Sequence, residues 1–244
     1  MGKVMFLKKG EMHTAPKKPV IEASTIAVGS TVYLNENGNT APYLVVHQGL
    51  PSTLYDSSCN GMWLLRKDIL EKRVWNEGQF ASAYYTTSTI NTYLNGTFIS
   101  LFDSATQAAI KQVKIPYVSS YRDPGTINSG TNGLSVKAFL LSLVEVGAST
   151  YYVEQLPYDG AKLSYFEQGD GTSANSKRIA YLNGVATSWM SRSPVLDAGT
   201  AEHIIYPAGT FSSAIISTAN GVRPAFIVSS TAVFNQNTLI LEGV

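Results

Sequence analysis

The chain has 244 residues, of which 44% are hydrophobic and only 14% are charged, a globular composition with fewer charges than the usual share of about 25%. Its formal net charge of +1 excludes binding to nucleic acids or membranes that is driven by overall charge. The single cysteine excludes an internal disulfide and a thiolate metal cluster, and no apolar run reaches the length of about 18 residues that a transmembrane helix needs.

Residues 1–24 are expected to form a basic leader. Five lysines and one glutamate within residues 1–19 give this stretch a charge of +4. A solvated attachment segment is favoured over a nucleic-acid contact, because charge runs of this kind are usually solvent-exposed arms. The apolar residues 4–7 are too few for a signal-peptide core, so we expect no secretion signal and synthesis in the cytoplasm. A ligand-binding domain is expected over residues 25–244.

Short strands are expected in both halves of this domain. Residues 31–34 and 43–47 are apolar or alternating, and the Asn-Gly pair between them indicates a hairpin turn. Residues 62–66 predict a third strand that is buried. Further short strands are expected at residues 204–206, 214–217 and 225–228.

Three helices are expected between the early and the late strands. Ser88 or Thr89 is positioned to cap the first helix and Asp103 the second, because short polar side chains accept hydrogen bonds from free N–H groups at a helix start. Residues 136–146 carry apolar side chains at i, i+1, i+4 and i+5 and predict a third helix, ended by Gly147. Strands, then helices, then loops and short strands predict an α+β fold.

No motif indicates catalysis or metal binding. His13, His47 and His203 are far apart and lack the spacing of metal ligands. Neither a Gly-x-Ser-x-Gly motif nor a phosphate-binding loop occurs, and Cys59 is expected to be a small buried side chain. We therefore expect no enzyme, no metal and no cofactor, although a pair of distant carboxylates for glycoside hydrolysis stays open.

Two similar segments near the C-terminus are the most informative feature of the chain. One reads Trp-Met-Ser-Arg-Ser-Pro from Trp189, and the other reads Gly-Val-Arg-Pro-Ala-Phe from Gly221. Both arginines are expected to bond backbone carbonyls or buried acids, because a buried guanidinium must be satisfied. The residues that we call the structural anchors are Trp189, Arg192, Pro194, Arg223, Pro224 and Phe226.

The two segments together resemble the C-terminal signature of a family of C-type-lectin-like domains from gut Firmicutes and their phages. Several members of that family look like the variable proteins of diversity-generating retroelements, in which a reverse transcriptase rewrites codons between the anchors. The resemblance covers residues 26–234, and the leader is similar to those of prophage structural proteins. It implies a C-type-lectin-like fold with short helices, small antiparallel sheets and a loop-rich C-terminal half.

The resemblance also implies that residues 186–220 display a ligand-binding surface. Ile205 and Ile216 are expected to face inward, and Phe211 is open between a contact residue and a core residue. Ligand motifs of calcium-dependent sugar sites do not occur intact, so no calcium site is expected. The expected ligand contacts are Ser188, Met190, Asp197, Thr200, Glu202, His203, Tyr206, Phe211, Ser213, Ile215 and Thr218.

The resemblance implies a display protein that binds a bacterial surface protein or glycan. It is expected to be a tail-associated receptor-binding protein of a phage or prophage, or a retroelement-diversified variable protein, located on the virion or the bacterial surface. The leader would join it to other virion or tail proteins, and a homo-oligomer is one arrangement. Diversified segments of that family are often rich in Asn, Tyr and Ser, whereas this segment has one asparagine, Asn220, and one tyrosine, Tyr206, so diversification stays open. The alternatives are a bacterial surface or structural interaction protein and a glycan-acting enzyme.

Overall fold

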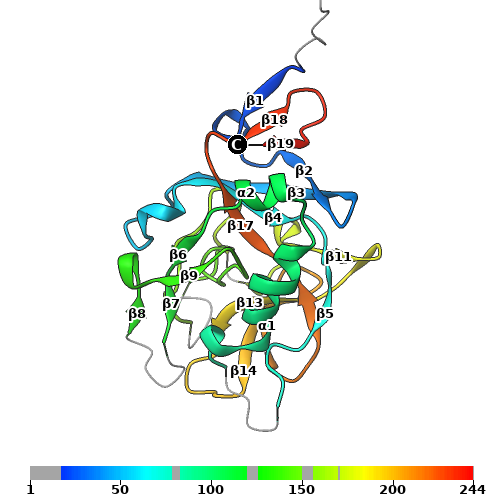
Figure 1. The fold of residues 1–244 in the computed structure, drawn as a ribbon. Helices are drawn as coiled ribbons and strands as arrows, with labels where there is room; N and C mark the ends of the chain where they lie inside the picture. The colour runs from blue at the N-terminus through cyan, green and yellow to red at the C-terminus, as the bar shows by residue number, and fades with distance from the viewer. Residues whose placement is uncertain (1–17, 79–82, 120–125, 150–155, 170, 244) are drawn as a thin grey trace, which may run out of the picture.

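The computed structural model describes residues 18–78, 83–119, 126–149, 156–169 and 171–243. Strands make up 37% of these residues and helices of all kinds 16%. The fold is therefore largely β, and Figure 1 shows strands in the N-terminal, middle and C-terminal parts of the described chain. This finding corrects the expected α+β class and, with it, the expected C-type-lectin-like fold.

One five-stranded antiparallel sheet has the strand order β10-β17-β4-β3-β2. Asn37 and Gly38 join β2 to β3 with φ angles of 53° and 77°, as a two-residue hairpin turn requires. The predicted hairpin and the buried strand after it are thus confirmed. The strands are β2 (Thr31–Glu36), β3 (Asn39–Gly49), β4 (Gly61–Arg66), β10 (Ala138–Phe139) and β17 (Ala225–Val228).

A second five-stranded sheet has the order β15-β14-β13-β16-β5. Only the pair β13–β16 is parallel within it. The late strands expected from the sequence correspond to β14, β15 and β17, although β14 and β15 begin a few residues earlier. The strands of this sheet are β5 (Glu71–Arg73), β13 (Trp189–Pro194), β14 (Ala201–Ile205), β15 (Phe211–Ile215) and β16 (Asn220–Val222).

Smaller sheets complete the fold. A three-stranded sheet of β1 (Val20–Glu22), β18 (Val233–Asn235) and β19 (Leu241–Gly243) lies at the opposite end of the molecule from β14 (Figure 1). The expected leader thus ends in a paired strand, while residues 1–17 lie outside the described part of the chain. The remaining pairs are β6 (Val113–Ile115) with β9 (Leu134–Val136), β7 (Tyr117–Val118) with β8 (Ile127–Asn128), and β11 (Tyr181–Leu182) with β12 (Val185–Ala186).

The first two expected helices are present and short. Ser88 caps α1 (Thr89–Tyr93) by accepting from the N–H of Asn91, and Asp103 caps α2 (Ser104–Ala109) by accepting from the N–H of Thr106. A π-helical segment, Leu94–Phe98, continues α1. The 3-10 turns are Ala23–Thr25, Ser57–Cys59, Tyr85–Thr87, Gly130–Asn132 and Ser176–Arg178.

The third expected helix, at residues 136–146, is wrong. The chain there ends β9, forms β10 and then turns. Phe139 and Leu141 pack into one hydrophobic core and Leu140 into another. Consecutive side chains that face opposite cores have the period of extended chain, not the single apolar face of a helix.

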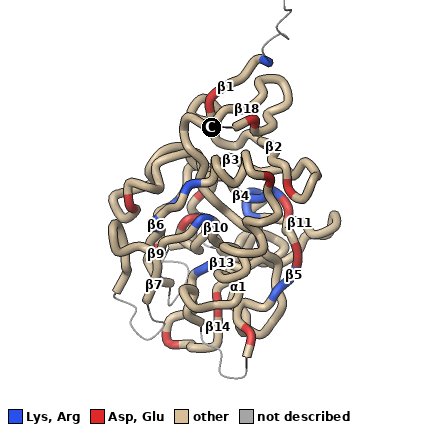
Figure 2. The backbone as a smooth tube through the Cα atoms, viewed as in Figure 1, with Lys and Arg blue, Asp and Glu red and all other residues tan. Residues whose placement is uncertain are grey.

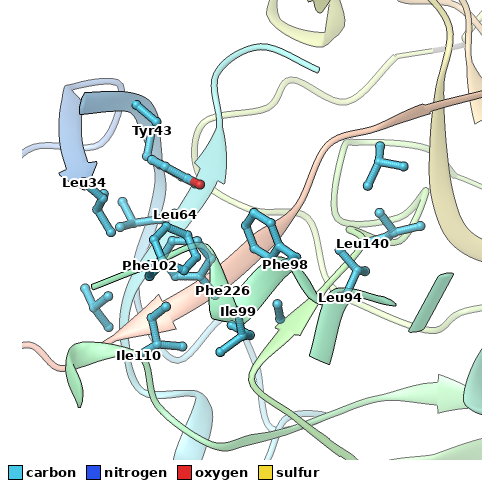
Figure 3. Close-up of a cluster of buried hydrophobic side chains, with 14 of the residues drawn as sticks. Leu34, Tyr43, Leu64, Leu94, Phe98, Ile99, Phe102, Ile110, Leu140 and Phe226 are labelled. Carbon is cyan, nitrogen blue, oxygen red and sulfur yellow. The ribbon is translucent and has the colours of Figure 1, made fainter. Parts of the chain in front are cut away.

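Two hydrophobic cores lie on opposite faces of β4 and β17. Leu64 and Phe226 point into the first core, where Phe226 meets Phe102 with 5.5 Å between ring centroids (Figure 3). Trp63 and Leu65 point into the second core, which also holds Trp189 and Ile205. Both faces of the central strands are therefore covered, which explains why β4 is apolar without interruption. Among the described residues, no helix is both long and apolar enough to cross a bilayer.

Candidate ligand-binding surface

Arg192 on β13 is fully buried and uses every N–H group of its side chain. Both nitrogens at its tip donate to the carboxylate of Glu145, at 2.6 and 2.7 Å. The same two nitrogens donate to the carbonyls of Leu140 (3.0 Å) and Asp159 (2.7 Å), and Nε donates to Pro116 O (3.3 Å). Arg192 therefore ties β13 to three separate loops.

Two buried acids belong to this cluster. Glu145 also accepts from the hydroxyl of Tyr55 at 2.6 Å, and Asp159 accepts from Ser193 Oγ at 2.9 Å. Burial raises the pKa of Asp159 to about 7, and the nearby Arg192 charge offsets part of that rise. Glycoside hydrolysis needs two carboxyl groups that face a substrate cleft, whereas these two are buried with internal partners. The geometry of this pair supports a structural role.

Arg223, between β16 and β17, is buried but only partly satisfied. Its Nε donates to Arg66 O at 2.9 Å and its Nη2 to Lys67 O at 3.1 Å. The guanidinium carbon lies 5.0 Å from the ring centroid of Trp189. Nη1 has no hydrogen-bond partner in the described part of the chain. Burial lowers the pKa of Arg223 to about 10.

The other structural anchors are core residues. Trp189 and Phe226 have no exposed surface, and Pro194 and Pro224 are buried. The indole N–H of Trp189 donates to Arg178 O at 2.9 Å. All six anchors therefore lie inside the protein.

Of the expected contacts, a first group is exposed. These residues lie on the turn from β13 to β14, on the turn from β14 to β15, on β15 itself, and on the connection from β15 to β16. The side chain of Ile215 is 60% exposed and that of Tyr206 is 45% exposed. We call this group the edge surface; its members are Asp197, Thr200, Tyr206, Ser213, Ile215 and Thr218.

Three expected contacts are buried, which corrects their assignment to the surface. Met190 and Glu202 have no exposed surface, and His203 is 5% exposed. Met190 packs in the first core. The inner strands β13 and β14 are covered on both faces, so alternation along them does not bring side chains to solvent. Ile205 and Ile216 are buried, in line with their predicted inward orientation.

Ser188 and Phe211 are half-buried. The carbonyl of Ser188 accepts from the N–H of Gly221 at 2.9 Å, across the parallel pair β13–β16. Phe211 packs against the second core, and the guanidinium carbon of Arg178 lies 4.1 Å from its ring centroid. Of the two readings left open for Phe211, its contacts therefore favour the core.

The edge surface includes the outer edge of a strand. β15 is the outermost strand of its sheet. Phe211 N–H donates outward to Gly171 O (2.9 Å), whereas Ile216 N–H donates inward to Thr200 O (3.0 Å). Because these groups alternate along an antiparallel strand, Ser213 directs its N–H and C=O away from β14. Such an edge can pair with an added strand.

Two buried residues of this region were missed in the sequence. Glu145, the partner of Arg192, lies in the segment expected to be helical. Its Ser-x-x-Glu spacing from Ser142 is the capping-box pattern, and the side chains do bond each other's N–H groups (2.8 and 3.1 Å). Arg178 is buried and donates to Val146 O (2.8 Å). No sequence motif distinguishes Arg178 from a surface arginine.

The remaining reactive residue types have structural surroundings. Cys59 is buried as predicted, and burial raises the pKa of its thiol to about 12. His47 Nδ1 lies 2.7 Å from Ser164 Oγ. His13 lies outside the described residues.

Comparison with known proteins gives one match. Residues 60–230 fit the sequence pattern of a family described as a domain of unknown function, DUF6273. No curated protein and no solved structure matches the chain.

Proposed function

The chain belongs to the DUF6273 family, and we propose that it is a display protein that binds a bacterial surface protein or glycan through the edge surface. Its setting would be the tail of a phage or prophage, where it would act as a receptor-binding or retroelement-diversified variable protein. The expected contacts that are buried are not part of this proposal.

One observation carries the proposal. Within a single segment, exposed positions collect on an edge strand and its adjoining turns, while the flanking anchors are buried and hydrogen-bonded. A rigid base next to a solvent-facing edge favours binding, because the protein then loses little conformational entropy when a partner binds.

The physical chemistry of the edge surface fits variation as well as binding. Substitutions at exposed positions usually change stability by less than about 0.5 kcal/mol, so these side chains can change without loss of the fold. Tyr206 and Ile215 supply the largest apolar contacts. They lie near opposite ends of β15, which are about 13 Å apart at the usual rise per residue of a strand.

The leader and the assembly complete the proposal. The leader, residues 1–24, would attach the domain to other virion or tail proteins, and a homo-oligomer would display several copies of the edge surface. Several weak contacts made together bind far more tightly than one.

The test is binding of the purified chain to intact gut Firmicutes cells and to a glycan array. Tyr206→Ser and Ile215→Ser should each weaken binding at least about tenfold, a change equivalent to about 1.4 kcal/mol. Val20→Ser is the matched control, because Val20 is 42% exposed and lies on β1, at the other end of the molecule (Figure 1).

The proposal is contradicted if the chain binds neither the cells nor any glycan, or if all three variants bind as tightly as the wild type.

Diversification has its own test in the genome. A reverse-transcriptase gene beside this one, with a near-copy of the codons for residues 185–225, is the expected finding for a diversified protein.

A further inference from the structure

Arg223 lines a small cleft of about 180 Å³, and its Nη1 has no hydrogen-bond partner among the described residues. Nε and Nη2 of Arg223 share one edge of the planar guanidinium, and both donate to carbonyls at the end of β4. Nη1 lies at the other edge, and no carboxylate of the described residues forms an ion pair with it. A buried cation in this state is stabilised by any anion that reaches it.

The wall of the cleft carries a local excess of positive charge. Lys67, Lys177 and Arg223 line it, and Asp68 is the acid among the lining residues, which gives these four a net charge of +2. Lys177 also pairs with the exposed Glu167 at 2.8 Å. Elsewhere in the part of the chain that Figure 2 colours by charge, charged residues are scattered thinly, so this concentration is local.

The shape of the cleft limits what it can hold. Its volume fits one small polar group and little more. Tyr165 forms part of the wall, and Tyr181 is shared with a neighbouring cleft of about 480 Å³. A ligand would therefore place its charged end beside Arg223 and its neutral remainder across Tyr181.

We propose that this Arg223 cleft binds a single oxyanion group, a carboxylate or a phosphate, at the end of a small ligand. Arg and Lys are the side chains that bind such groups by charge-assisted hydrogen bonds. The residues involved are distinct from the edge surface, so this proposal stands or falls independently of the proposed function.

The experiment follows the thermal unfolding midpoint of the full chain with sodium glucuronate or inorganic phosphate as the probe. Sodium chloride at equal ionic strength and neutral glucose are the references, because salt alone screens surface charges. A ligand that binds only the folded state raises the midpoint. At least one of the two anions should raise it above both references.

Variants then locate the site. Lys67→Gln should weaken binding of the anion that raises the midpoint at least about threefold, because it removes a positive charge from the wall. Lys72→Gln, an exposed lysine on β5 outside the cleft, should bind like the wild type. Arg223→Lys should abolish the rise of the midpoint with anion if the variant folds. If it does not fold, the result for Lys67→Gln tests the site.

Each outcome discriminates. A response to phosphate alone identifies a phosphate site, a response to glucuronate alone identifies a carboxylate site, and a response to both supports the shared chemistry. If neither anion raises the midpoint, or if Lys67→Gln responds as the wild type does, the Arg223 cleft is not an oxyanion site.

Discussion

Arg192 donates all of its side-chain N–H groups within the protein, whereas Arg223 leaves Nη1 without a partner among the described residues. Both arginines were predictable as buried and bonded, because each lies beside proline and aromatic residues in an otherwise uncharged segment. Their partners were not predictable. Glu145 lies 47 residues before Arg192 and Arg66 lies 157 residues before Arg223, and no local pattern connects positions so far apart.

At the scale of single residues, Glu145→Gln tests the buried pair. The variant leaves the Arg192 charge buried without its carboxylate, so we expect the free energy of unfolding to fall by about 3–5 kcal/mol. Urea denaturation measures this change. Glu167→Gln breaks an exposed pair with Lys177 and should cost less than about 1 kcal/mol. Equal effects of the two substitutions would show that the buried pair does not hold β13 in place.

The elements that could be predicted are those set by interactions between residues close together in the sequence. The hairpin of β2 and β3 and the starts of α1 and α2 follow from an Asn-Gly turn and from capping side chains, which act within a few residues. Residues 136–146 contain the capping-box spacing of Ser142 and Glu145, and their apolar spacing also fits a helix. Consecutive side chains there are buried in two separate cores, and a sequence does not reveal how many cores surround a segment.

At the scale of elements, Gly221 tests the contact between β13 and β16. A Cβ atom at Gly221 would lie 2.7 Å from Ser188 O and 2.8 Å from Ile69 Cδ1. Gly221→Ala should therefore destabilise the fold by about 1–3 kcal/mol. Gly96→Ala is the control, because a Cβ atom at Gly96 would meet nothing within 4 Å, and alanine in a helical segment is neutral or better by up to about 1 kcal/mol.

Thermal denaturation of both glycine variants measures the difference. A Gly221→Ala protein that unfolds at the wild-type temperature would mean that the two strands separate slightly at little cost. The close approach of Gly221 to Ser188 would then not explain the glycine in this anchor.

For the whole molecule, the segment from β16 to β17 is decisive, because it leaves one five-stranded sheet and enters the other. Arg223 lies at this crossing and bonds the end of β4. The sequence indicated that the segment was structurally constrained, but not that it joins two sheets. The fold class was wrong for the same reason. Many of the strands are only two or three residues long, and their pairing partners are remote in the chain.

Glu202, on β14, has no exposed surface, and neither carboxylate oxygen has a hydrogen-bond partner among the described residues. Burial raises its pKa well above 4.5, and the nearby Asn220 amide offsets this only in part. Above pH 4.5 the unfolded chain releases a proton that the folded chain keeps. Stability therefore falls as pH rises toward the folded-state pKa, by up to about 1.4 kcal/mol per pH unit.

Urea titrations of the wild type and Glu202→Gln across this pH range isolate the effect, since Asp159, whose raised pKa acts in the same direction, is common to both proteins. The wild type should lose stability relative to the variant with increasing pH, and parallel curves would refute the assignment. A mildly acidic buffer should then be the better choice for purifying, storing and crystallising this protein, and alkaline media should shorten its shelf life.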